Sequence, residues 1–137
     1  DDFDWHDRDG QPDFTVHIGG RAVALECKNV RSPLASRTGR PRKEPRVRVE
    51  LQKTRNSKDG TNTRGYRFSE FDVIGVCLFN QTGRWDFMYA PCASLAHRQD
   101  APDFLEVYHP VPLVPEGFWN GNLLEVLQAA SEAKRRA

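Results

Sequence analysis

The sequence predicts a single α/β domain in which helices flank a central mixed β-sheet. Two alternating segments on either side of Gly19-Gly20 are typical of a β-hairpin, and residues 71–79 form a continuous apolar run of strand length. Residues 121–136 have the apolar spacing of an amphipathic helix. A chain of 137 residues supports one hydrophobic core, so we expect one domain over residues 1–137.

The hairpin is the most clearly predicted element. Apolar side chains alternate with polar or small ones in residues 14–18 and again in residues 22–28, which predicts two half-buried strands. Gly19-Gly20 between them is typical of a two-residue hairpin turn. The preceding residues 1–12 have a turn-forming composition, and we expect them to be irregular.

The segment between the hairpin and the apolar run is rich in charge. Residues 29–46 contain three prolines and one glycine among many basic residues, which predicts a long loop. Residues 47–56 alternate like a strand at their start, but their ELQKTR portion favours a helix, so both interpretations stay open. Residues 57–65 are polar and predict another loop.

The second half of the chain is expected to complete the sheet. Residues 71–79 predict a central strand, and residues 85–90 predict its partner after a glycine-containing turn at 80–84. The later elements are a short helix at 91–98 opened by Pro91, a strand at 104–108, an extended segment at 110–115, and a helix at 121–136 whose apolar face holds Leu123, Leu124, Leu127 and Ala130.

Positive charge is concentrated in the middle of the chain. The formal net charge of +1 divides into −5 for residues 1–20, +10 for residues 21–67 and −4 for residues 68–137. Concentrated basic charge is expected of a protein that binds a polyanion, whereas a solvated loop is an equally good explanation on charge alone. The side chains expected to contact phosphates are Arg31, Arg37, Arg40, Arg42, Lys43, Arg46, Arg48, Lys53, Arg55 and Lys58.

Cysteine usage and hydropathy bear on location. Cys27, Cys77 and Cys92 are odd in number and form no CxxC pair, which favours a reducing, intracellular (cytoplasmic) setting, associated with the nucleoid or nucleus if the protein binds DNA. No run of 18 apolar residues and no secretory signal is present in the sequence, so no membrane association is expected. Because the first residue is Asp, we expect the chain to belong to a longer protein.

The register of the hairpin brings two acids together. A two-residue turn at Gly19-Gly20 pairs Phe14 with Leu25 on the apolar face, and it therefore sets Asp13 opposite Glu26 on the other face. Directly opposed side chains have Cβ atoms about 5 Å apart, and like charges at this distance destabilise a sheet. A raised pKa on one acid would relieve the repulsion, and a hard cation such as Mg²⁺ would do so better.

A third charged residue extends this polar face. Lys28 lies two residues beyond Glu26 and therefore on the same face, about 6–7 Å further along the strand. Ala22 and Ala24 leave the face uncrowded, with space for a substrate. Two carboxylates, one ammonium group and small neighbours suit phosphodiester hydrolysis, in which a metal polarises oxygens and activates water while a cation stabilises the developing charge.

At these residues the sequence resembles the PD-(D/E)XK, or restriction-endonuclease-like, nuclease superfamily. The matching residues are Pro12-Asp13, twelve intervening residues, and Glu26-Cys27-Lys28. In that family the Asp opens the second core strand and the ExK lies on the third. The resemblance implies a restriction-endonuclease-like core in which Asp13 and Glu26 bind Mg²⁺ (with Mn²⁺ as a substitute), the Cys27 carbonyl adds a ligand, and Lys28 assists catalysis.

Two further family features have less direct matches. Many members carry a Gln on the helix after the third strand, and Gln52 is its natural match here, which favours helix for residues 47–56. Members usually also have an acidic residue on a helix before the signature. No such helix is predicted before Asp13, so we expect Asp4, Asp7 or Asp9 to substitute, or the helix to lie outside this chain.

The sequence therefore predicts a Mg²⁺-dependent endonuclease that hydrolyses DNA phosphodiesters in restriction, repair or recombination, as a homodimer or fused to further domains. The alternative is a non-catalytic nucleic-acid-binding domain that retains the nuclease fold. A third, weaker alternative is a protein-interaction domain whose basic loop meets an acidic partner. We expect Trp5, Trp85 and Trp119 to be core or lid residues rather than platforms for stacked bases.

Overall fold

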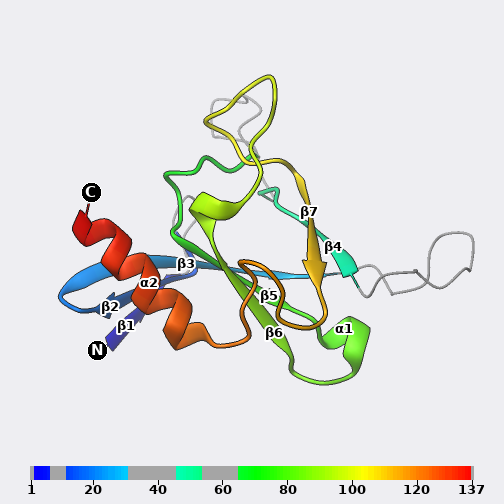
Figure 1. Cartoon of the computed structure of the whole chain (residues 1–137), viewed down its shortest axis with the longest axis horizontal. Coiled ribbons are helices and arrows are strands. Elements are labelled where there is room, and N and C mark those ends of the chain that lie inside the picture. Colours follow the sequence, from blue (N-terminus) through cyan, green and yellow to red (C-terminus); the bar gives the residue numbers. More distant parts are fainter. Residues whose placement is uncertain (1, 7–11, 31–45, 54–64, 137) are drawn as a thin grey trace, which may run out of the picture.

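The computed structural model describes residues 2–6, 12–30, 46–53 and 65–136. Its largest element is a five-stranded sheet with the strand order β1-β2-β3-β5-β6 (Figure 1). Neighbouring strands are antiparallel except β3 and β5, which are parallel, so the predicted central mixed sheet is confirmed. The strands are β1 (Asp2–Trp5), β2 (Phe14–Ile18), β3 (Arg21–Asn29), β5 (Val73–Cys77) and β6 (Phe87–Pro91).

The β2–β3 hairpin has the predicted register. Phe14 pairs with Leu25, and the ladder runs regularly to the turn. Gly19 and Gly20 have φ angles of 59° and 76°. Two successive positive φ values define the turn type whose twist matches the flanking strands, and glycine adopts them without strain.

The apolar run at residues 71–79 becomes the interior strand β5, as predicted. All five residues of β5 are buried, because β3 and β6 flank it and both faces of the sheet are covered. The expected turn at 80–84 is a four-residue helix, α1 (Phe79–Thr82), which ends at Gly83 in the left-handed conformation. A short 3₁₀ helix (Cys92–Ser94) follows Pro91, where a short helix was expected.

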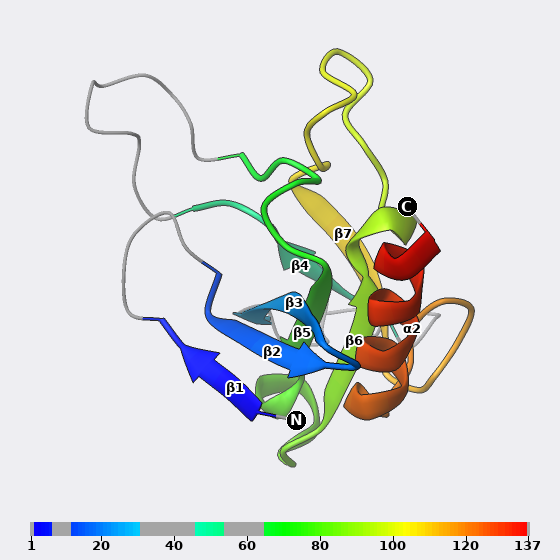
Figure 2. The ribbon, with the colours of Figure 1, turned by 90° about the vertical axis from the view of Figure 1, so that its left-hand side faces the viewer.

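One face of the sheet packs against the C-terminal helix α2 (Leu123–Arg136), which lies beside the strands in Figure 2. Val126, Leu127 and Ala130 are buried in the same apolar cluster as residues of β2, β3 and β5. The predicted apolar face was wrong at Leu124, which is 55% exposed. The buried stripe follows positions 123, 126, 127 and 130, and residue 124 lies to one side of it.

The other face packs against a two-stranded antiparallel sheet of β4 (Arg46–Glu50) and β7 (Tyr108–Pro112). Val47, Val49 and Val111 belong to the larger apolar cluster, together with residues of β5 and β6. The prediction of flanking helices therefore holds for only one face of the described structure, because strands cover the second face.

Two local predictions were wrong and one open alternative is decided, in each case by tertiary pairing. Residues 47–56 were open between strand and helix, with the family resemblance favouring helix, and Arg46–Glu50 forms a strand because burial of alternate valines against the sheet outweighs helix propensity. Residues 104–108 were expected to be a strand, but the strand is Tyr108–Pro112, where β4 supplies the partner. Residues 2–5, expected to be irregular, form the edge strand β1.

The cysteines and helices add two observations. Cys27, Cys77 and Cys92 are all free, and the last two are buried. Among the helices that the structure describes, none has the length and apolar character needed to cross a membrane.

Asp72 connects β3, β5 and α2, and its removal is expected to destabilise the protein. Its Oδ2 accepts a hydrogen bond from the Ala24 amide at 2.7 Å and pairs with Lys134 Nζ at 2.8 Å. Asp72→Ala is expected to lower the free energy of unfolding by about 1–3 kcal/mol in urea titrations, because the Ala24 amide loses its acceptor. Asp100→Ala, which removes an exposed loop carboxylate, is the control, and its urea midpoint is expected to shift much less than that of Asp72→Ala. Equal midpoints for the two variants would contradict the assignment.

Candidate metal centre

Asp13, Glu26 and Lys28 lie on one face of the central sheet. Asp13 immediately precedes β2, and the other two residues lie on β3. Glu26 pairs with Ile74 and Lys28 with Val76, and paired residues on neighbouring strands point to the same face. Since Ile74 and Val76 belong to the cluster on the β4–β7 side, the candidate centre opens on that side.

Asp13 is held by hydrogen bonds to both neighbouring segments. Its Oδ2 accepts a hydrogen bond from the Cys27 amide at 2.8 Å, and its backbone carbonyl accepts one from the His6 amide at 2.9 Å. The carboxyl groups of Asp13 and Glu26 also interact electrostatically. The two acids therefore lie close together, as their opposed positions in the register require.

Glu26 is a buried acid with an altered proton affinity. Its side chain is only 7% exposed. Burial, followed by the negative charge of Asp13, raises its pKa from 4.5 to about 7, while the charge of Lys28 acts in the opposite direction. Protonation of Glu26 at lower pH thus relieves the repulsion between the two carboxylates.

Tyr66 contacts three charged residues of the centre, one acid and two lysines. Its hydroxyl donates a long hydrogen bond, 3.4 Å, to Glu26 Oε1. Lys28 Nζ is 4.9 Å and Lys53 Nζ is 5.4 Å from the centroid of its ring, both within cation–π distance. Burial raises the pKa of Tyr66, so the hydroxyl keeps its proton and remains a donor.

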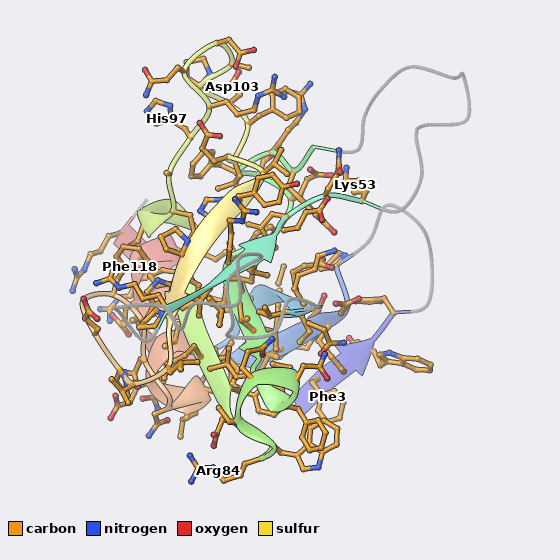
Figure 3. The ribbon with its side chains drawn as sticks, turned by 90° about the vertical axis from the view of Figure 1, so that its right-hand side faces the viewer. Phe3, Lys53, Arg84, His97, Asp103 and Phe118 are labelled. Carbon is orange, nitrogen blue, oxygen red and sulfur yellow. The ribbon has the colours of Figure 1, made fainter. Side chains whose placement is uncertain are left out.

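Lys53 reaches this centre from the segment that follows β4 (Figure 3). Its ammonium group forms an ion pair with Glu70 as well as contacting Tyr66. The centre therefore combines two carboxylates, two lysines and one tyrosine from segments far apart in the chain.

The donor set fits a hard divalent cation. Two carboxylates converge, and the present charge balance leaves one of them with a pKa near neutrality; Mg²⁺ prefers one or two carboxylates and keeps water in its other positions. Among the described residues no group of three or more His, Cys, Asp or Glu side chains is arranged for a metal.

The acids expected to replace the N-terminal family ligand are described only in part. Residues 2–5 form β1 rather than a helix, and Asp4 on that strand pairs with His17 at 3.2 Å. Asp7 and Asp9 lie outside the described residues.

Gln52 does not lie on a helix, contrary to the expectation for residues 47–56. It follows β4 and forms a single bridge with Gly65, the residue before Tyr66. Its sequence neighbour Lys53, expected only to contact phosphate, is the residue of this segment that contacts the centre.

The structure describes part of the predicted phosphate-binding set. Arg46 and Arg48 lie on β4, where Arg46 pairs with Glu116 and Arg48 lies 4.5 Å from the centroid of the Tyr108 ring. The members outside the described residues are Arg31, Arg37, Arg40, Arg42, Lys43, Arg55 and Lys58.

Sequence reasoning missed Tyr66. It lies forty residues beyond Glu26, at the end of a polar segment with no periodic pattern. Its place in the centre depends on the packing of the β4–β7 layer against β3, which no local signal reports.

No family model matches the chain, and neither the curated proteins nor the solved structures contain a significant match to it. The functional interpretation therefore depends on the chemistry of the centre.

Proposed function

We propose that this protein is a Mg²⁺-dependent endonuclease that hydrolyses DNA phosphodiesters, with a restriction-endonuclease-like core of the PD-(D/E)XK superfamily. The observation that carries the proposal is the electrostatic interaction between Asp13 and the buried Glu26, with Lys28 two residues further on the same face of β3. A buried carboxylate pair next to an ammonium group contributes little to packing and is well suited to phosphoryl chemistry.

The strand arrangement supports the same proposal. Asp13 immediately precedes the second strand of the sheet, and Glu26 and Lys28 lie on the third, which are the positions of the signature in that superfamily. The fold departs from the family expectation at residues 47–56, where Gln52 follows a strand instead of lying on a helix.

Each residue has a distinct role in this proposal. Asp13 and Glu26 would hold the cation, and the carbonyl of Cys27, the residue after Glu26, would be a further oxygen ligand. Mg²⁺, or Mn²⁺ in its place, would acidify a bound water and neutralise charge on the phosphate. Lys28 orients the attacking water and stabilises charge on the phosphate oxygens, and Gln52 supports the substrate.

DNA is the proposed partner because of the charge distribution. Residues 21–67 carry a net charge of +10 and include Lys28, Lys53 and Tyr66 of the centre. Lys53 and the basic side chains of residues 31–58 would bind the phosphate backbone, with affinity that falls steeply as salt increases. The chain would act as a homodimer or as one domain of a longer intracellular protein.

Cleavage of supercoiled and linear DNA in the presence of Mg²⁺, Mn²⁺ or EDTA tests this function. Cutting that requires the metal and stops in EDTA is the expected result. A folded protein that binds DNA equally well in EDTA and never cuts it would favour the second candidate, a non-catalytic nucleic-acid-binding domain. The pairing of Asp4 with His17 favours that candidate, because Asp4 was one of the acids expected to substitute for the family's N-terminal ligand.

Tyr66→Phe is expected to weaken Mg²⁺ binding about fivefold, because Glu26 loses a donor worth about 1 kcal/mol while the ring stays in place. Cleavage at saturating Mg²⁺ is expected to remain close to the wild-type rate. Titration of Mg²⁺ by calorimetry, alongside cleavage rates over the same Mg²⁺ range, measures both effects.

Tyr66→Leu is the matched variant that also removes the ring. Without the cation–π contact Lys28 is less well positioned, so the maximal cleavage rate is expected to fall about tenfold in addition to the loss of metal affinity. If both variants had the metal affinity and the maximal cleavage rate of the wild type, Tyr66 would not be a positioning residue.

A further inference from the structure

An exposed arginine, Arg67, directly follows the tyrosine of the candidate centre. Tyr66 is buried with its hydroxyl on Glu26, whereas Arg67 is exposed, as expected of successive residues in an extended segment. The Cα atoms of the two residues are one peptide unit apart, about 3.8 Å. Arg67 is therefore attached to the centre by the chain itself, and its side chain faces solvent.

The guanidinium group of Arg67 is held over an aromatic ring. Its Cζ atom lies 4.5 Å from the centroid of the Phe104 ring, within cation–π distance. Stacking occupies one face of the planar group and leaves the N–H donors around its edge for an oxygen ligand. In the part of the chain that the structure describes, no acid forms an ion pair with Arg67. The guanidinium is thus held in place without a carboxylate on its donors.

The Phe104 ring is fixed to the segment that carries Tyr66. Arg67 and Phe104 form an antiparallel bridge, so their side chains point to the same side. Beside this bridge, the Leu105 amide donates to the Tyr66 carbonyl at 2.8 Å. A Cβ atom at Gly65 would lie 3.3 Å from the ring, so glycine allows the ring to approach the backbone closely. The ring and the guanidinium therefore keep their positions through backbone pairing at Tyr66.

Glu70 connects Arg67 to a lysine of the centre. Its Oε2 accepts a hydrogen bond from the Arg67 amide at 2.6 Å, and its Oε1 pairs with Lys53 Nζ. Lys53 and Lys28 both lie against the ring of Tyr66. Three cationic side chains are thus tied to Tyr66 or to the residue that follows it. A nucleic-acid strand, which carries a series of closely spaced phosphates, is the ligand that such a set of cations fits.

The segment that supplies the ring projects from the body of the protein. Residues 96–106 extend beyond both sheets in Figures 1 and 2, and Figure 3 labels His97 and Asp103 on this projection. Its return half pairs with the chain at Tyr66. A projection attached at the centre is suited to contact a substrate that is longer than the reacting group.

We propose that Arg67, held on the Phe104 ring, binds a phosphate of the DNA backbone and so orients the strand at the candidate centre. This inference rests on the proposed nuclease function and adds a substrate-binding residue to that site. A guanidinium group binds two phosphate oxygens at once, which fixes the direction of the contact as well as its position. Because the contact is to phosphate, it carries no information on base sequence.

Equilibrium binding of DNA in EDTA tests the inference without depending on cleavage. The probes are two short blunt duplexes of unrelated sequence, titrated at several salt concentrations. Arg67→Ala is expected to raise Kd about tenfold for both probes and to reduce the slope of log Kd against log salt by about one, because one phosphate contact is lost. Arg67→Lys retains the charge but not the planar group, so it is expected to keep the slope and to raise Kd about threefold.

Arg98→Ala is the matched control. Arg98 lies over the same ring, 5.9 Å from its centroid, but its guanidinium donates to Asp100 through two N–H groups, at 3.2 and 3.0 Å. Because these donors are already occupied, its removal is expected to change Kd by about twofold or less and to leave the slope unchanged. Phe104→Leu keeps the Arg67 charge but removes the ring, so it is expected to raise Kd about threefold at an unchanged slope.

The outcomes separate this inference from the nuclease function. Metal-dependent cleavage together with an unchanged Kd and salt slope in Arg67→Ala would overturn the role of Arg67 and leave the nuclease assignment intact. A reduced slope in Arg67→Ala, in a protein whose wild type binds DNA but never cleaves it, would support the phosphate contact and reject the nuclease assignment. Equal losses in Arg67→Ala and Arg98→Ala would also overturn the role of Arg67, because a general change in surface charge would then explain both.

Discussion

Lys28→Ala is expected to lower the maximal rate of DNA cleavage by roughly two to three orders of magnitude. Lys28 follows Glu26 on the same face of β3, and its ammonium group is held against the ring of Tyr66 at 4.9 Å from the centroid. In the proposed site it is the charge best placed to stabilise negative charge on a phosphate bound to a cation that Asp13 and Glu26 would hold. Its removal acts mainly on the reaction step, so Kd for DNA is expected to change little.

Lys53→Ala is the matched control for this experiment. Lys53 lies at a similar distance from the same ring, 5.4 Å, but it comes from another segment and pairs with Glu70. Its removal is expected to raise KM for DNA and to leave kcat within about tenfold of the wild type, because it contributes backbone binding. Single-turnover cleavage at saturating DNA separates the two parameters, and similar kcat values for Lys28→Ala and the wild type would reject the proposed role of Lys28.

Glu26→Gln is expected to stabilise the metal-free protein by about 3 kcal/mol above pH 7. Folding raises the pKa of Glu26 from 4.5 to about 7, so the folded state binds more protons than the unfolded state between these values. The wild-type protein therefore loses stability as the pH rises through this window, and the loss is complete above pH 7. Glutamine has no proton to lose and avoids the penalty.

Urea titrations of both proteins from pH 4 to pH 8.5, in EDTA, measure this effect. The difference in free energy of unfolding between Glu26→Gln and the wild type should increase steadily from pH 4.5 to 7. Adding Mg²⁺ at about one hundred times its Kd at pH 8 should restore about 2.7 kcal/mol to the wild type and nothing to the variant. Parallel stability curves, or equal stabilisation of both proteins by Mg²⁺, would contradict the assignment of Glu26 as a metal ligand.

The elements that could be predicted from the sequence are those with a strong local pattern. The β2–β3 hairpin follows from a period of two and a glycine turn, and its register places Asp13 opposite Glu26 without any other information. The central strand β5 and the helix α2 follow from one apolar run and one apolar stripe. The candidate acids and Lys28 could be named for the same reason, because all three belong to a single hairpin.

The elements that could not be predicted depend on distant partners. Residues 2–5 have no clear strand signal, and they form β1 because the open edge of β2 is available to pair with them. Residues 47–50 combine helix propensity with a strand-like apolar pattern, and their pairing with β7 decides in favour of the strand. Tyr66 joins the centre through packing between layers, and Trp85, expected to be a core or lid residue, is 73% exposed and therefore not in the core.

Because Asp13, Glu26 and Lys28 belong to one hairpin, the geometry of the reactive groups is separated from the segments that determine substrate preference. The spacing of the two acids is determined by the hydrogen-bond ladder of one hairpin, so it does not change with the length of the segments that join β3 to β4 and β4 to β5. Those segments carry much of the basic charge. Substrate preference can therefore diverge between relatives through insertions and deletions there while the reactive geometry stays constant.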